Sequence, residues 1–448
     1  MGGLTFGSTN FKEQIEAERE RIIHEISTDL QKTNPKLFEE GINPNNWKVI
    51  ESLIRESVLS KHQLLPPEAD QVVKQIIGRG TGWGPLIEFV IGPDADEITE
   101  VQIVPQGKNP PNVFICKNGR PIYAGNHYFK DSHDAVLNFC RKIVEDAGRE
   151  LLKDAPIVDA WMKDMSRLAV SAYSVCPQGV AATIRKSPLT RPPMPLEEMV
   201  ANGTMPRIFY DMTRDLFIPG GASMSVNGRT DSGKTTLLKG MYGFINPQER
   251  VIIGETSFEM FLPHLPNCYN LVEVVVGGKN VVTMKDICIN AGRINPDWFI
   301  VSEIRGIEIV AAFTIAESLS GKFGSTLHAG GVNEFRSKIF KLYPDLPMQY
   351  VDSQIQSVYH FLIFTDKDAK GKRTLMELVE VTEDGYETIL KFDESEYAAT
   401  NGKVRRWIYN KPISEKRLAR LAFRGARNID AYTVVKEKFH YAENTEVA

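Results

Sequence analysis

The sequence has few cysteines and lacks any long apolar run. Its five cysteines are scattered, with no two within three residues of each other, whereas disulfide frameworks and zinc sites need cysteines at close, repeated spacings. We therefore expect a reducing compartment, with neither a disulfide framework nor a zinc site. No stretch of about 18 consecutive apolar residues is present, so no membrane-spanning helix is predicted.

No secretory leader is expected, since no basic segment followed by an apolar one opens the chain and acidic residues begin at Glu13. The net charge of −4 disfavours a protein that coats nucleic acid through bulk charge. The 448 residues are too many for one compact core, so two or three domains are expected. Together these features predict a cytoplasmic protein.

The first 190 residues divide into a helical and a mixed segment. Apolar residues recur at helical spacing within residues 9–77, and Pro66-Pro67 opens the last of three predicted helices. Residues 1–77 are thus predicted to form a helical N-terminal extension. Short strands and a helix alternate over residues 78–190, which we expect to form a smaller α/β or α+β lobe. The predicted elements are strands at 100–104, 113–116 and 181–184, a turn at Asn118-Gly119 and a helix at 132–145.

Four prolines within residues 188–195 predict a stiff linker at a domain boundary. Beyond it, β and α segments alternate as in a parallel α/β sheet. We therefore predict one α/β domain over residues 196–395, followed by a less regular, basic tail over 396–448. The predicted strands are 224–227, 251–254, 298–302, 325–327 and 361–365, with a hairpin around Asp384-Gly385.

A phosphate-binding loop follows the first of these strands. Residues 228–235 match the pattern Gly, any four residues, Gly-Lys-Thr. Backbone N–H groups of such a loop and the next helix N-terminus hold phosphate oxygens, Lys234 can bridge the β- and γ-phosphates, and Thr235 can bind Mg²⁺. The predicted nucleotide-binding residues are Gly228, Arg229, Thr230, Asp231, Ser232, Gly233, Lys234, Thr235 and Thr236. The alternative is a glycine-rich turn with an incidental lysine.

Polar groups follow three other predicted strands. Because the C-terminal ends of parallel strands share one edge of the sheet, these groups are expected to meet the nucleotide there. We predict that Glu303 orients the attacking water and that His328 contacts the γ-phosphate, while Glu255 and Glu259, with Thr235, hold Mg²⁺, partly through water. Taken singly, each could equally be a surface or capping group.

In this order, the motifs resemble those of the type II/type IV secretion (traffic) ATPases, most closely the tight-adherence (Tad) pilus branch. The resemblance covers residues 78–395. The matching segments are Trp83–Leu86 with Glu97–Glu100, Arg167, Thr183–Lys186, the phosphate loop, Glu255–Glu259, Arg293–Gly306 and Gly324–Ala329. The absence of a tetracysteine module favours the Tad-like branch.

The resemblance implies a homohexameric ring of two-lobed subunits whose C-terminal lobe is RecA-like. ATP with Mg²⁺ would sit between the lobes, and hydrolysis would drive pilus assembly or substrate export. Arg167 and Arg185 would reach the phosphates from the N-terminal lobe, although either could be an ordinary surface ion pair. The implied partner is an inner-membrane platform protein, which places the chain at the inner face of the cytoplasmic membrane, with nucleic acid only as transported cargo.

Four positions depart from the family pattern. Asp231 stands in place of a glycine, Thr256 of a carboxylate, Ser302 of a glycine and Lys322 of a histidine. Asp231 brings a negative charge beside the triphosphate. The departures bear on the turnover rate more than on nucleotide binding. Two other functions therefore stay open, a nucleotide-gated scaffold with weak hydrolysis and a P-loop phosphotransferase.

A basic segment covers residues 403–427, with Glu415 as its one acidic residue. Its cations are Lys403, Arg405, Arg406, Lys411, Lys416, Arg417, Arg420, Arg424 and Arg427. Such a segment is either a solvated helix face or a contact for anionic lipid, nucleic acid or an acidic partner.

Overall fold

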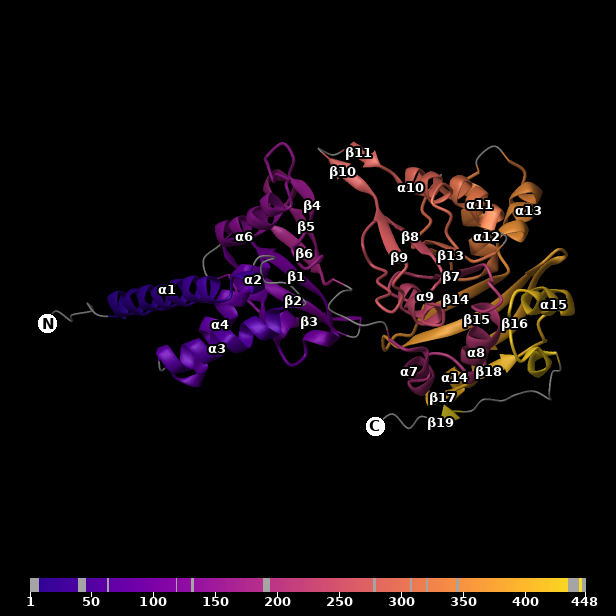
Figure 1. Cartoon of the computed structure of the whole chain (residues 1–448), viewed down its shortest axis with the longest axis horizontal. Helices are drawn as coiled ribbons and strands as arrows, with labels where there is room; N and C mark the ends of the chain where they lie inside the picture. The colour runs from indigo at the N-terminus through magenta and orange to yellow at the C-terminus, as the bar shows by residue number, and fades with distance from the viewer. Residues whose placement is uncertain are drawn as a thin grey trace. The chain divides into compact units, whose positions relative to one another are not determined.

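The computed structural model describes residues 8–38, 46–62, 64–117, 119–129, 133–187, 194–276, 279–306, 308–319, 321–343, 346–433 and 443–444. Contacts divide the chain into two compact units, Met1–Arg191 and Pro192–Ala448. Both are visible in Figure 1, and each is considered by itself. Most of the predicted linker (188–193) and Asn118 of the predicted turn lie outside the described residues.

Helices open the first unit, as predicted. They are α1 (Ser8–Thr33), α2 (Pro35–Phe38), α3 (Trp47–Lys61) and α4 (Pro66–Thr81). Prolines suit the first turn of α4, where N–H groups lack helical partners, and Gly82 ends the helix in the left-handed region at φ 85°. The apolar stripe of α1 is buried at Ile22, Ile26 and Leu30, in the same core as the sheet that follows.

The sheet of the first unit is wholly antiparallel, with the order β3-β2-β1-β6-β5-β4. Its strands are β1 (Ile98–Gln106), β2 (Asn109–Lys117), β3 (Arg120–Gly125), β4 (Ile157–Trp161), β5 (Arg167–Ser171) and β6 (Ala181–Arg185), accompanied by α5 (Glu88–Ile91) and α6 (His133–Asp146). The sequence did not predict β3, β4 and β5, which are short and half-exposed.

The second unit holds a nine-stranded sheet in the order β18-β16-β15-β14-β7-β13-β12-β8-β9. The strands from β14 to β9 are parallel, and β15, β16 and β18 extend the sheet in antiparallel fashion. Their bounds are β7 (Met224–Gly228), β8 (Val251–Glu255), β9 (Cys268–Val272), β12 (Trp298–Val301), β13 (Phe323–Leu327), β14 (Phe361–Lys367), β15 (Arg373–Thr382), β16 (Gly385–Phe392) and β18 (Trp407–Tyr409). The predicted RecA-like α/β fold class is confirmed.

Helices cover both faces of this sheet (Figure 1), each over its own apolar cluster. One face carries α7 (Leu196–Ala201), α8 (Arg207–Met212), the π-helix η5 (Thr213–Phe217), α9 (Lys234–Tyr242) and α15 (Glu415–Phe423). The other carries α10 (Met284–Ala291), α11 (Glu308–Leu319), α12 (Val332–Lys341) and α13 (Met348–Val358). The remaining short elements are β10 (Val274–Val276), β11 (Lys279–Val282), α14 (Glu394–Ala399), β17 (Val404–Arg405) and β19 (Glu443–Asn444).

Residues after 395 contribute to the core of the second unit. Trp407 and Tyr409 of β18 and Leu418 and Leu421 of α15 are buried in the cluster beneath the sheet. Across the described residues, every helix is too short or too polar to cross a bilayer.

Candidate functional site

The phosphate loop joins β7 to α9, as predicted. Gly228 has φ 156° and Gly233, which precedes α9, has φ 91°. Both angles favour glycine, and a Cβ at Gly228 would also collide with the carbonyl oxygen of Thr365 on β14. The glycine spacing of the sequence motif thus follows from backbone geometry.

Lys234 lies under the loop, with only 8% of its surface exposed. Its ammonium donates to the carbonyl oxygens of Gly228 (3.1 Å) and Arg229 (3.0 Å), and its Nζ lies 3.4 Å from His328 Nδ1. Burial lowers the pKa of Lys234, opposed by the negative charges of Glu303 and other nearby carboxylates. Lys234 is therefore a buried cation with carboxylates nearby, placed where phosphate oxygens are expected to bind.

Asp231 is paired with two cations, one on β14 and one on β15. Its carboxylate contacts Lys367 Nζ at 2.6 Å and Arg373 Nη2 at 2.5 Å. Burial alone would raise the pKa of Asp231, but these two partners outweigh it and lower the pKa. Its φ of 61° is one that Asp tolerates better than most residues. The extra negative charge of the loop is thus locally compensated.

Glu303 and His328 meet at the ends of β12 and β13. Their Oε1 and Nε2 atoms are 2.8 Å apart, and the other oxygen of Glu303 bonds Arg305. Burial raises the pKa of Glu303, but Arg305 outweighs this effect and leaves the pKa lowered. Burial, followed by the charge of Lys234, lowers the pKa of His328. Near neutral pH the pair is therefore a carboxylate beside a neutral imidazole.

Glu255 and Glu259 occupy different environments. The Glu255 side chain is fully buried; Oε1 accepts from the backbone N–H groups of Glu259 (3.1 Å) and Met260 (2.8 Å), and Oε2 accepts from Asn270 Nδ2 (2.6 Å). Burial raises the pKa of Glu255 to about 7. Both Glu255 oxygens thus serve the protein's own donors, whereas Glu259 is partly exposed and its charge acts on Lys234.

An open cleft of about 300 Å³ lies beside the loop. It is lined by Arg229, Thr230, His328, Ala329, Gly330, Glu334 and Lys338. The Lys338 ammonium bonds the carbonyl oxygen of His328 and pairs with Glu334 at 2.7 Å. The cleft therefore joins the phosphate loop to the histidine segment and adds a cation, Lys338, that the sequence motifs did not predict.

The two arginines expected from the N-terminal lobe lie opposite each other in the first unit. Arg167 on β5 is the register partner of Arg185 on β6. Arg167 also pairs with Asp159 of β4 at 2.8 Å. The two arginines are therefore neighbours on adjacent strands. That they bind nucleotide phosphates stays a prediction.

Known proteins of similar sequence are named for secretion and conjugal transfer. The family model described as type II/IV secretion system protein matches residues 178–344. A protein of Mycobacterium tuberculosis named for conjugal transfer is 27% identical over 295 residues, which cover 63% of this chain and 81% of that protein. Protein VirB11 of Agrobacterium fabrum is 32% identical over 127 residues, 28% of this chain and 36% of VirB11. These matches support a relationship with the type II/IV secretion ATPase superfamily.

A solved structure of similar size is the ATPase DotB of Legionella pneumophila. It is 19% identical, the match covers 65% of this chain and 79% of DotB, and the TM-score is 0.46. The residues matched by the secretion family model include the phosphate loop, Glu303 and His328.

Magnesium usually binds nucleotide sites through one or two protein oxygens, with phosphate and water oxygens completing its shell. Thr235, half-buried in the first turn of α9, and the partly exposed Glu259 fit that role in this chain. Within the described ranges, no group of three or more His, Cys, Asp or Glu side chains could hold a metal ion.

Proposed function

We propose that this chain hydrolyses ATP to ADP and phosphate. The observation that carries the proposal is the contact series from Lys234 to His328 to Glu303, which joins the phosphate loop to a carboxylate at the end of β12. Backbone N–H groups of the loop and Lys234 would bind the phosphates. Sequence similarity to VirB11 adds support.

The chemistry assigned to these residues is a displacement at the γ-phosphorus. A water oxygen bonds phosphorus as the bond to the bridging oxygen of ADP breaks, and Glu303 accepts a proton from that water. Arg305 and His328 hold the Glu303 carboxylate in place. Mg²⁺ bound at Thr235 and Glu259, when present, would neutralise phosphate charge. Arg167 and Arg185 would add positive charge if the first unit reaches the nucleotide.

The test compares wild type with Lys234→Ala, Glu303→Gln and a control, Glu394→Gln, which removes an exposed carboxylate of α14. We expect Lys234→Ala to lose nucleotide binding. Glu303→Gln should keep binding and lose at least about 100-fold in kcat, as removal of a general base does. The control should match wild type. Equal phosphate release by all four proteins would exclude this mechanism.

At the level of the machine, we propose a homohexameric motor of a Tad-like pilus, a secretion system or a conjugation system. It would act as a cytoplasmic protein at the inner face of the membrane, on an inner-membrane platform protein, with the 403–427 segment touching anionic lipid. The relatives named for conjugal transfer and VirB11 support this proposal. Mass measurement with a non-hydrolysable ATP analogue tests the ring, since a monomer at every concentration would contradict it.

A nucleotide-gated scaffold is the second candidate. It is favoured by the Lys234 ammonium, which is already satisfied by two loop carbonyl oxygens. Tight ATP binding with a rate unaffected by Glu303→Gln would support the scaffold. A phosphotransferase would instead place a labelled γ-phosphate on an acceptor other than water.

A further inference from the structure

The basic segment 403–427 separates into buried and exposed cations. Arg405 is only 2% exposed and donates to Gly203 O (2.7 Å), so it is part of the core. Arg417 is also largely covered, donating to Val381 O at 2.8 Å beside the buried carboxylate of Glu380. Lys403 and Lys411 are exposed ahead of α15, and Lys411 pairs with Glu387. A second group of cations lies on α15 and the turn after it.

The α15 helix is built to present one face outward. Ser414 caps its N-terminus by accepting from Arg417 N (3.2 Å), and Leu418 and Leu421 are buried against the sheet. On the opposite side lie Arg420 and Phe423, and Phe423 is 83% exposed. We call Arg420, Phe423, Arg424 and Arg427 the basic face.

Positive charge on the basic face is not balanced. Within the described part of the chain, no carboxylate lies within 4.0 Å of Arg420 or Arg424, whereas Lys416 beside them pairs with Glu383. Burial, followed by Arg420 and Arg417, lowers the pKa of Arg424. Burial, with the same three arginines, also lowers the pKa of His360 to about 3. The arginines therefore create a local positive potential.

The basic face lies near the N-terminal ends of the parallel strands, whereas the phosphate loop lies at their C-terminal ends. A side chain at Gly321 would collide with the Arg424 guanidinium, and one at Gly220 would meet Leu421. These glycines precede β13 and β7, whereas the phosphate loop follows the end of β7. The two sites are thus separated by the length of the parallel strands.

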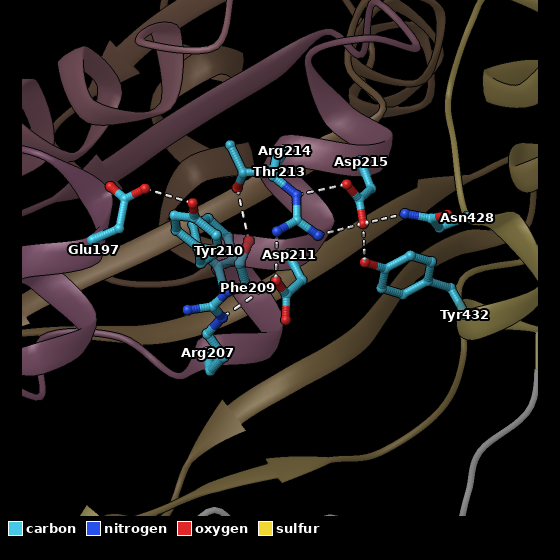
Figure 2. Close-up of polar contacts among 10 residues, drawn as sticks. All are labelled: Glu197, Arg207, Phe209, Tyr210, Asp211, Thr213, Arg214, Asp215, Asn428 and Tyr432. Atoms are coloured by element: carbon cyan, nitrogen blue, oxygen red, sulfur yellow. Dashed lines mark hydrogen bonds and ion pairs between the residues drawn. The ribbon is translucent and has the colours of Figure 1, made fainter.

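A polar network fixes the turn after α15 in place (Figure 2). The Asp215 carboxylate accepts from Arg214 Nε (2.7 Å), Asn428 Nδ2 (3.0 Å) and Tyr432 OH (3.1 Å), and its backbone oxygen accepts from Arg427 N (2.7 Å). Asp215 is paired with Arg214, so its negative charge does not neutralise the basic face. The π-helix η5 thus holds the basic face in a set orientation.

We propose that the basic face docks on an anionic lipid bilayer. Exposed arginines supply attraction to lipid phosphates, and an exposed phenylalanine beside them can enter the headgroup region. The Phe423 ring lies 5.8 Å from Arg420 Cζ, so both would reach the same patch of lipid. A nucleic-acid track would need cations along several elements, whereas the basic face comprises one helix and the turn after it. This inference refines the membrane-side location proposed above and places the nucleotide edge of the second unit away from the bilayer.

The experiment is flotation of the full chain with vesicles of phosphatidylcholine, alone or with about one-third phosphatidylglycerol. We expect binding to the anionic vesicles only, weakened by salt. Arg420→Ala with Arg424→Ala should weaken it about 30-fold, since each cation near an anionic surface contributes about a factor of five. Phe423→Ala should weaken it several-fold. The matched controls, Lys285→Ala with Lys341→Ala and Tyr350→Ala, remove exposed groups of the same kind elsewhere and should bind as wild type.

Equal flotation of wild type and the double arginine variant would overturn the proposal. So would equal binding to neutral vesicles, or retention of an oligonucleotide through these arginines without retention of anionic vesicles. ATP hydrolysis measured in the same samples separates the two proposals. A protein that hydrolyses ATP but does not bind anionic vesicles refutes only the proposed docking surface. A protein that binds the vesicles but does not hydrolyse ATP refutes only the proposed hydrolysis.

Discussion

Glu303 Oε1 and His328 Nε2 lie 2.8 Å apart, although 24 residues of sequence and a helix separate them. On the other side of the imidazole ring, Nδ1 lies 3.4 Å from the Lys234 ammonium. If Lys234 donates to Nδ1, the proton of the neutral ring stays on Nε2 and points at the carboxylate. His328 then links the residue that holds phosphate to the residue that would activate water.

The first prediction concerns pH. Because burial and Lys234 lower the pKa of His328, the ring should stay neutral from its ordinary value of 6.5 upward. We expect kcat for ATP hydrolysis to be level from neutral to mildly alkaline pH and to fall only in acid, where a charged ring would repel Lys234. The check is a pH–rate profile of wild type and His328→Gln. An inflection above 6.5 that the variant abolishes would contradict the assignment.

Asp231 gives the second prediction. Asp231→Asn keeps a residue that tolerates the left-handed backbone but frees Lys367 and Arg373 from their carboxylate partner. With one negative charge fewer beside the phosphates, the affinity for an ATP analogue should rise about 3- to 10-fold at low salt and less at high salt. Calorimetry measures this change, with Asp366→Asn as a control on β14. Weaker binding would mean that Asp231 is needed to shape the loop.

The sequence predicted five of the six parallel strands, because each is a short apolar run followed by a polar or glycine-rich turn. It missed β9, which has no buried residue. It also predicted that Glu303 and His328 converge, since strand ends share an edge. The lateral order of the strands in the sheet could not be predicted from the sequence. Nothing local shows that β14 lies beside β7, so the contacts of Thr365 and Lys367 with the loop were missed. A charge-balance argument for Asp231 could have prompted a search for cations downstream.

Other parts of the site depended on packing rather than pattern. Glu255 was expected near the metal, yet the loop after β8 turns back and satisfies both of its oxygens. The cross-strand pairing of Arg167 with Arg185 required β5, whose five residues carry too little periodicity to be recognised. The sequence predicted the basic tail as one charged segment. It could not show that Arg405 and Arg417 are buried, because both contact residues of β15 that are distant in the sequence.

The third prediction follows from buried Glu255, whose pKa is raised from 4.5 to about 7. The folded state keeps this proton at pH values where the unfolded chain has lost it, so the carboxyl favours folding fully below 4.5. That contribution declines as pH rises to about 7, by about 3 kcal/mol in total, and is constant above. Urea unfolding of wild type and Glu255→Gln across this range checks it. The difference between the two proteins should change between pH 4.5 and 7 and stay flat in alkali; a pH-independent difference would show that folding does not shift the pKa of Glu255.

The fourth prediction tests the packing beneath the histidine segment. Gly324 on β13 faces the hydroxyl of Tyr242 on α9, and a Cβ there would collide with it in a fully buried setting. Gly324→Ala must therefore displace Tyr242, at a cost of about 1–3 kcal/mol in the free energy of unfolding.

Gly331 provides the control. It lies seven positions along the chain with no heavy atom within 4 Å of a Cβ built on it, and its φ of 179° is open to any residue. Gly331→Ala should therefore leave stability within about 0.5 kcal/mol of wild type. Thermal unfolding of both variants decides the matter, and equal midpoints would mean that α9 shifts freely against β13. Such freedom would also loosen Lys234, the first residue of α9, so nucleotide affinity of Gly324→Ala provides an independent second readout.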